Sequence, residues 1–184
     1  SNEVRLWGRD AAYAATMEAE RENGRYLPGA RFPDTLRVTG DLDAALDGVT
    51  DVLLVVPSHA FAVLTETLTA RLSNDVGFAW ATKGFEPGSG RFLHEVASAH
   101  LHPSTPRGVV TGPSFAREVA AGLPGALTVA ADRVSFARHV AQALGGERLR
   151  GYTSEDLVGA AVGGAVKNAL AVAAGISDAL GFGA

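Results

Sequence analysis

The residue in this 184-residue sequence that most clearly points to chemistry is Lys167, because it lies within a long apolar segment. Residues 157–184 consist almost entirely of Ala, Gly, Val, Leu and Ile, and their only charged side chains are Lys167 and Asp178. Burying a lone ammonium group costs free energy, so the group needs a partner or a task. Burial also lowers the pKa of a lysine, which allows lysines to carry protons near neutral pH.

Three interpretations of this segment are open from the sequence. Its length suits a transmembrane helix, which needs about 20 apolar residues, although a central lysine beside an asparagine is costly in lipid. It could instead be a core helix whose lysine extends to the surface. In the third interpretation Lys167 works in a cleft. On a helix it shares a face with the small residues Ala160, Gly163 and Gly164, which leave room beside the amine.

Three further polar residues follow predicted strands at points where a ligand could bind. Lys83 comes after an apolar strand and before a glycine that lets the chain turn, although such lysines are usually solvated. Ser114 can cap a short helix expected over 115–121, either as a plain cap or beside amides that would suit a phosphate or carboxylate. Arg9 lies where a dinucleotide-binding fold usually carries an acidic residue, and an arginine there suits a 2′-phosphate.

Composition narrows the class of protein. A hydrophobic content of 47 % with mixed charges predicts a soluble globular protein. A net charge of −4 without a basic stripe argues against nucleic acid as a partner. The absence of cysteine excludes disulfides and zinc fingers and fits a reducing compartment. The polar first ten residues show no signal segment, so we expect the cytoplasm. The five histidines are scattered, and we predict no metal site.

Short apolar strands alternate with helices along the chain, which is the pattern of a doubly wound α/β sheet. We expect strands at 3–7, 36–39, 51–57, 76–81, 108–111, 126–130 and 148–152. Helices lie between them, with Ser58 and Ser154 as caps of the helices that follow. Ligands of such sheets bind beyond the carboxyl ends of the strands. The Gly-, Pro- and Ser-rich turns at these ends, together with Arg9 and Lys83, predict a site for an anionic ligand. The chain nevertheless lacks the G-x-G-x-x-G motif with which dinucleotide-binding folds usually begin.

Several blocks of sequence, in order along essentially the whole chain, closely resemble the bacterial NAD(P)-dependent glycerol-3-phosphate dehydrogenases. These blocks are VRLWGRD at 4–10, FPDTL at 32–36, VVPSH at 55–59, WATKG at 80–84, GPSFA at 112–116, GGAVKN at 163–168, GISD at 175–178 and GFGA at 181–184. The resemblance implies interconversion of sn-glycerol 3-phosphate and dihydroxyacetone phosphate with NAD or NADP, in phospholipid synthesis. It also implies a Rossmann-like fold.

The resemblance also implies roles for individual residues. Lys167 is expected to accept the proton of the substrate C2 hydroxyl, and Lys83 to contact both substrate and nicotinamide cofactor. Gly112 and Ser114 match substrate-binding positions, and Asn168 is expected to orient the substrate. On the cofactor side, Ala116 matches a binding position, and Arg9 and Tyr26 match positions near the adenosine half.

Members of this family begin with a strand and glycine-rich loop that precede residue 1 of this chain, and they continue into a helical domain. We therefore expect residues 1–153 to be a dinucleotide-binding domain without its first, central strand, and residues 154–184 to start an all-α substrate domain. Two strands would lack a neighbour, and residues 1–184 alone should be inactive. A homodimer is expected, whereas membrane insertion is not. A related hydroxy-acid dehydrogenase or a non-catalytic nucleotide-binding module remains an alternative.

Overall fold

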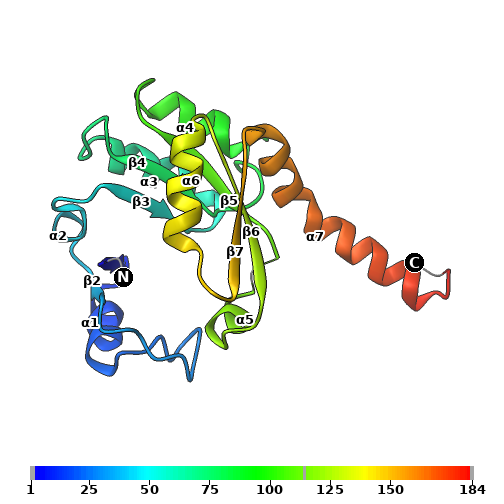
Figure 1. Ribbon diagram of the computed structural model, residues 1–184, viewed down its shortest axis with the longest axis horizontal. Coiled ribbons are helices and arrows are strands. Elements are labelled where there is room, and N and C mark those ends of the chain that lie inside the picture. Colours follow the sequence, from blue (N-terminus) through cyan, green and yellow to red (C-terminus); the bar gives the residue numbers. More distant parts are fainter. Residues whose placement is uncertain (1–2, 114, 183–184) are drawn as a thin grey trace.

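The computed structural model describes residues 3–113 and 115–182, except for the side chains of residues 168 and 169. Within these residues, seven strands form two sheets (Figure 1). The parallel pair β1 (Val4–Trp7) and β2 (Leu36–Thr39) forms the smaller sheet. The larger sheet has the order β3-β4-β5-β6-β7, and its strands are β3 (Asp51–Leu54), β4 (Gly77–Trp80), β5 (Arg107–Thr111), β6 (Gly125–Ala131) and β7 (Leu149–Ser154).

Helices connect the strands and cover both faces of the larger sheet (Figure 1). Neighbouring strands run parallel except β5 and β6, which pair antiparallel. The helices are α1 (Ala11–Glu20), α2 (Leu42–Leu46), α3 (Ser58–Thr69), α4 (Leu93–His100), α5 (Ala116–Ala120), α6 (Val134–Leu144) and α7 (Leu157–Ala179). The doubly wound, Rossmann-like α/β class predicted from the sequence is thereby confirmed.

Alternation along β4 divides the core into two layers. Phe78 and Trp80 pack with Phe61 of α3 and with the buried residues of α4. Ala79, which points to the opposite face, packs with α6 through Phe136 and its neighbours. Since side chains alternate between the faces of a strand, a continuous apolar strand requires cover on both sides. This arrangement holds the carboxyl end of β4, and with it Lys83, on a rigid base.

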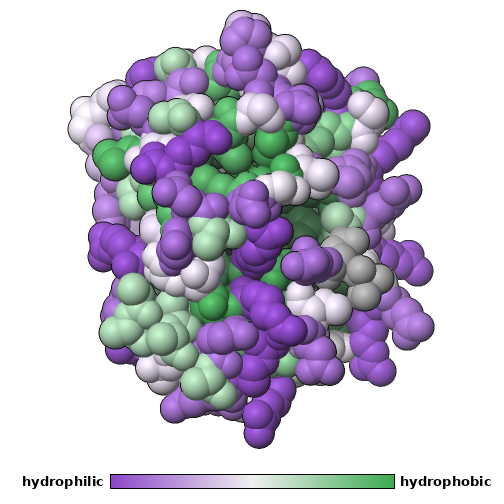
Figure 2. All heavy atoms as spheres, turned by 90° about the vertical axis from the view of Figure 1, so that its left-hand side faces the viewer, coloured by the Kyte–Doolittle hydropathy of each residue, from purple (hydrophilic) through white to green (hydrophobic). Residues whose placement is uncertain are grey.

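β1 and β3 each have an unpaired edge, because the two sheets are not hydrogen-bonded to each other. Apolar side chains on these strands and just after β3 are exposed, with Val4 at 46 %, Leu53 at 41 % and Val55 at 65 %. Seen from the side of α1 and α2, the surface has an apolar area among polar side chains (Figure 2). β1 and β3 thus lack a neighbouring strand on these edges, as the sequence predicts.

Two predicted helix caps are wrong. Ser58 is the first residue of α3, and Pro57 precedes it without a side-chain cap. Ser154 ends β7, and Asp156 caps α7 by accepting a hydrogen bond from the Gly159 amide at 2.7 Å. The Ser154 hydroxyl instead accepts from the Asp156 amide at 3.0 Å, so it supports the cap. Several acceptors stood close together in the sequence, and only backbone geometry selects among them.

The strand predicted over 51–57 is also too long, since β3 ends at Leu54. Beyond that point the Val56 amide donates to the Thr82 hydroxyl at 3.2 Å instead of continuing the ladder. Thr82 is buried, at 5 % exposure, and immediately precedes Lys83. The bond therefore ties the turn after β3 to the turn after β4, at the edge where the sequence predicts a site.

Candidate functional site

Lys83 and Lys167 meet at the carboxyl edge of the larger sheet. Lys83 follows β4, and Lys167 lies on α7, which packs on β5 and β6. Both side chains are half-buried. Burial, followed by the charge of Lys167 and a hydrogen bond with its side chain, lowers the pKa of Lys83 below its ordinary value of 10.5. A second positive charge so close by disfavours the charged form of Lys83.

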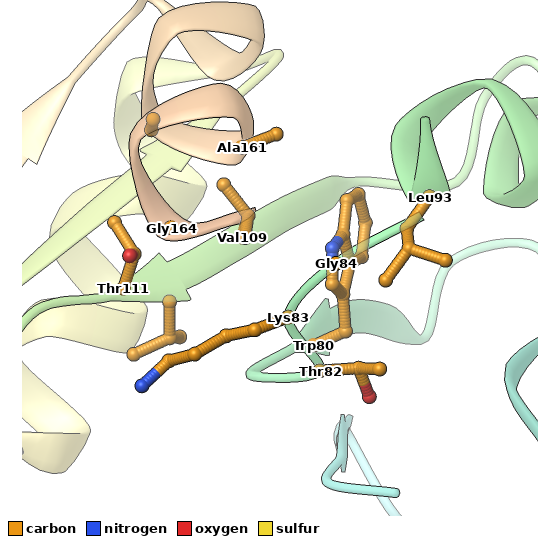
Figure 3. Close-up of a pocket in the computed structure, with 11 residues that line it drawn as sticks. Trp80, Thr82, Lys83, Gly84, Leu93, Val109, Thr111, Ala161 and Gly164 are labelled. Carbon is orange, nitrogen blue, oxygen red and sulfur yellow. The ribbon is translucent and has the colours of Figure 1, made fainter. Parts of the chain in front are cut away.

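A small pocket beside this pair has mostly apolar walls. Trp80, Leu93 and Val109 line it, and Lys83 and Thr111 supply polar groups. Figure 3 shows the Lys83 side chain running toward the Thr111 side of the pocket, while Thr82 points away. The pocket is small, but it lies at the carboxyl edge of the sheet, where ligands of such folds bind.

Two glycines allow the loops of this edge to turn. Gly84 has φ of +103°, a conformation that side-chain-bearing residues rarely adopt, so the chain turns away directly after Lys83. Gly112 has φ of +140°, and a Cβ there would lie 2.6 Å from the Ala126 carbonyl oxygen. The loop after β5 therefore passes close against the backbone of β6. A side chain at either position would displace the edge of the pocket.

Phe115 borders the lysine pair from the start of α5. The Lys167 Nζ lies 5.8 Å from the centre of the Phe115 ring, an attractive contact for an ammonium group. Ala116 begins α5 directly after it. The predicted site residue Ser114 lies outside the described residues. Asn168 belongs to α7, but its side chain is also outside them.

The predicted adenosine-side residues lie near the carboxyl end of β1. Arg9 follows this strand and is exposed, and Tyr26 is 69 % exposed. Asp10 caps α1 by accepting from the Tyr13 amide at 3.0 Å. The Tyr13 ring packs edge-to-face with Tyr26, with centroids 6.2 Å apart. This part of the edge belongs to the smaller sheet, and the contacts of the described residues do not join it to the lysine pair.

Two other features of the described residues bear on function. They contain no group of three or more His, Asp or Glu side chains placed to hold a metal ion. α7 is long and apolar enough, by length and composition only, to cross a membrane, and only 6 % of its most apolar stretch is buried within the structure. One such helix is weak evidence, because core helices pass the same test.

The fold and the site together define a Rossmann-like α/β protein with a lysine pair at the carboxyl edge of its sheet, where ligands of such sheets bind. The family described as NAD-dependent glycerol-3-phosphate dehydrogenase N-terminus matches residues 1–137. The chain belongs to this family, and the resemblance recognised from the sequence blocks is confirmed.

Similar proteins agree with this assignment. The glycerol-3-phosphate dehydrogenase [NAD(P)+] of Xanthomonas euvesicatoria pv. vesicatoria is 56 % identical over 178 residues, which cover 97 % of this chain and 52 % of that protein. The enzyme of the same name from Stenotrophomonas maltophilia is 53 % identical, also over 178 residues, which cover 97 % of this chain and 52 % of that protein. The crystal structure of glycerol-3-phosphate dehydrogenase from Coxiella burnetii is 43 % identical, with a TM-score of 0.89, over 99 % of this chain and 55 % of that one. The chain thus spans about half the length of these relatives.

One signal in the sequence could have indicated the pair directly. Lys83 and Lys167 are the only lysines in the chain, and every other cationic side chain apart from histidine is an arginine. The structure brings these two residues together although they are far apart in sequence. Lysine, unlike arginine, can lose its proton when buried, so its confinement to one site indicates proton chemistry there.

Proposed function

We propose that the full-length protein interconverts sn-glycerol 3-phosphate and dihydroxyacetone phosphate with NAD(P) and supplies glycerol 3-phosphate for phospholipid synthesis. The observation that carries this proposal is the contact of Lys83 with Lys167 in a chain of this family. A neutral amine can accept a hydroxyl proton, and an adjacent ammonium group can stabilise the oxygen that becomes a carbonyl. Lys83 lines the partly apolar pocket, and Lys167 is its neighbour, so the pair can supply both groups.

In the direction of oxidation, NAD(P)⁺ when bound accepts the hydride that leaves C2. Lys167 accepts the proton of the C2 hydroxyl, and Lys83 holds the same oxygen by a hydrogen bond. Burial and charge lower the pKa of Lys83, whereas the family resemblance assigns the role of proton acceptor to Lys167. The two roles are compatible because the amines are neighbours, so the proton that Lys167 accepts can pass to Lys83. General base catalysis of this kind contributes about 10²–10⁴-fold.

The residues near β1 suit the adenosine half of the cofactor. Arg9 is exposed and can pair with a 2′-phosphate, and the exposed Tyr26 ring offers a surface for a base. We assign Ala116 to the nicotinamide side, because it begins α5 next to Phe115 and the lysine pair. Gly112, Ser114 and Asn168 are assigned to the substrate by their places in the family blocks.

The domain boundary, assembly and location follow from the same proposal. Residues 1–153 form the cofactor domain, and α7 begins the substrate domain, in which its exposed apolar face packs against protein. Lys167 near the middle of α7 would be costly in lipid, which favours a protein of the cytoplasm. The homodimer stays a prediction, which light scattering on the full-length protein measures.

Turnover by the purified full-length protein tests this function. We expect oxidation of NADPH or NADH with dihydroxyacetone phosphate, at a kcat/KM at least 10²-fold above that for any 2-oxo acid of similar size. A higher kcat/KM for an oxo acid would favour the hydroxy-acid dehydrogenase. Cofactor binding without turnover of either substrate would favour the non-catalytic module.

A further inference from the structure

The two lysines have the surroundings of a covalent carbonyl-capture site as well as those of a proton relay. Lys83 lines the pocket, its side chain runs toward the Thr111 side, and it is only half-buried, so its amine is partly open to solvent. Its neighbour Lys167 lies close enough for its charge to lower the pKa of Lys83. A lysine becomes a nucleophile when it is desolvated or lies next to another cationic group, and Lys83 meets both conditions.

We propose that Lys83 forms an imine with small aldehydes that carry a phosphate group. Lys167 provides the selectivity, because its ammonium group attracts the phosphate dianion to the rim of the pocket. Burial and the charge of Lys167 both disfavour the protonated form of Lys83 and lower its pKa, which favours attack by its amine. The centre of the Phe115 ring lies 5.8 Å from the Lys167 Nζ, so this partner also has an aromatic face beside it.

The step balances without an oxidant or reductant. The lone pair of the Lys83 Nζ attacks the aldehyde carbon and a carbinolamine forms. Its hydroxyl, whose proton came from the nitrogen, takes one further proton from Lys167 and leaves as water, and an iminium ion remains. Lys167 regains a proton from solvent. Since the imine occupies the amine that holds the reacting oxygen, capture also blocks the proposed reaction. Water reverses it, so the block is reversible.

The test uses the full-length protein, D-glyceraldehyde 3-phosphate as the probe and borohydride to reduce the imine to a stable amine. Peptide mass spectrometry then locates the adduct. We expect at least tenfold more adduct on Lys83 than on Lys167, and at least tenfold less with unphosphorylated glyceraldehyde. Lys167→Met should lower the Lys83 adduct about tenfold, whereas the matched variant Lys167→Arg, which keeps the charge, should retain most of it.

Equal labelling of both lysines, or a Lys83 adduct that Lys167→Met leaves unchanged, would overturn the proposal. Labelling that does not depend on the phosphate would overturn its selectivity. The readout needs no turnover of glycerol 3-phosphate, although the proposal uses the same lysine pair as the proposed function. A protein that captures the aldehyde but reduces no dihydroxyacetone phosphate would therefore disprove the proposed function alone, and one with the reverse behaviour would disprove this inference alone.

Discussion

Gly164 sets how closely α7 approaches the sheet, and replacing it by alanine should displace Lys167. Gly164 is buried against the end of β5 (Figure 3). An added Cβ would lie 2.8 Å from the Thr111 Oγ1, whereas ordinary contact begins at 3.4 Å, so the helix or the threonine must move by about 0.6 Å. Rotation of the threonine offers little relief, because β-branched side chains are stiff at χ1. Lys167 is one helical turn further along the same face.

The displacement should lower turnover more than binding. Misplacing a catalytic group by about 1 Å can cost about 10²-fold, so for Gly164→Ala in the full-length protein we expect kcat to fall roughly tenfold. KM for the cofactor should change less than twofold. Because Lys167 moves away, the pKa of Lys83 should rise. The acid limb of the kcat profile for glycerol 3-phosphate oxidation, which requires a neutral amine, should therefore shift to higher pH. Stopped-flow absorbance of NAD(P)H across pH measures both effects.

The neighbouring Gly163 supplies the matched control. A Cβ at Gly163 would meet no described atom within 4 Å, so Gly163→Ala gains the same helix propensity, about 1 kcal/mol, without a displacement. Its kcat should stay within about twofold. In the double variant Gly164→Ala/Thr111→Ala the clashing oxygen is gone, and the pH profile should return to that of Thr111→Ala alone. Equal effects of the two glycine substitutions, or no recovery in the double variant, would refute the reasoning.

Four further outcomes are expected of the full-length protein. Lys167→Met should keep the fold and lower kcat by roughly 10²-fold or more, and turnover above a third of normal would exclude Lys167 as the proton carrier. Arg9→Asp should raise KM for NADPH much more than KM for NADH, since a carboxylate repels a 2′-phosphate; equal losses would mean that Arg9 contacts a part common to both. Thr82→Val removes the hydroxyl that accepts from the Val56 amide and leaves that amide without a partner. The free energy of unfolding, measured in urea, should fall by about 1 kcal/mol. Thr65→Val, equally buried, loses only a bond to a helix carbonyl and should cost less. The pKa of Lys83 is lower in the folded than in the unfolded chain, so the unfolded chain binds more protons at alkaline pH. The free energy of unfolding should therefore rise as pH approaches 10.5. Lys83→Met should flatten this slope.

Local patterns in the sequence determined the elements and their class. The alternation of short apolar strands with helices predicts a doubly wound sheet because each pattern reports which faces a segment buries. The apolar run around Lys167 predicts one long helix with an isolated cation, and the glycine after Lys83 predicts a turn at a strand end. The blocks of sequence around these residues were enough to identify the family.

Contacts between distant segments were decided only by the tertiary structure. Whether Lys167 is solvated, and which residue it meets, depends on how closely α7 packs on β5, and that distance is set by Gly164 against Thr111. The antiparallel pairing of β5 with β6 likewise depends on the path of the chain through α5. The sequence pattern records the burial of each segment but not its neighbour. The lysine pair, and the lowered pKa of Lys83 that follows from it, therefore exists only in the folded chain.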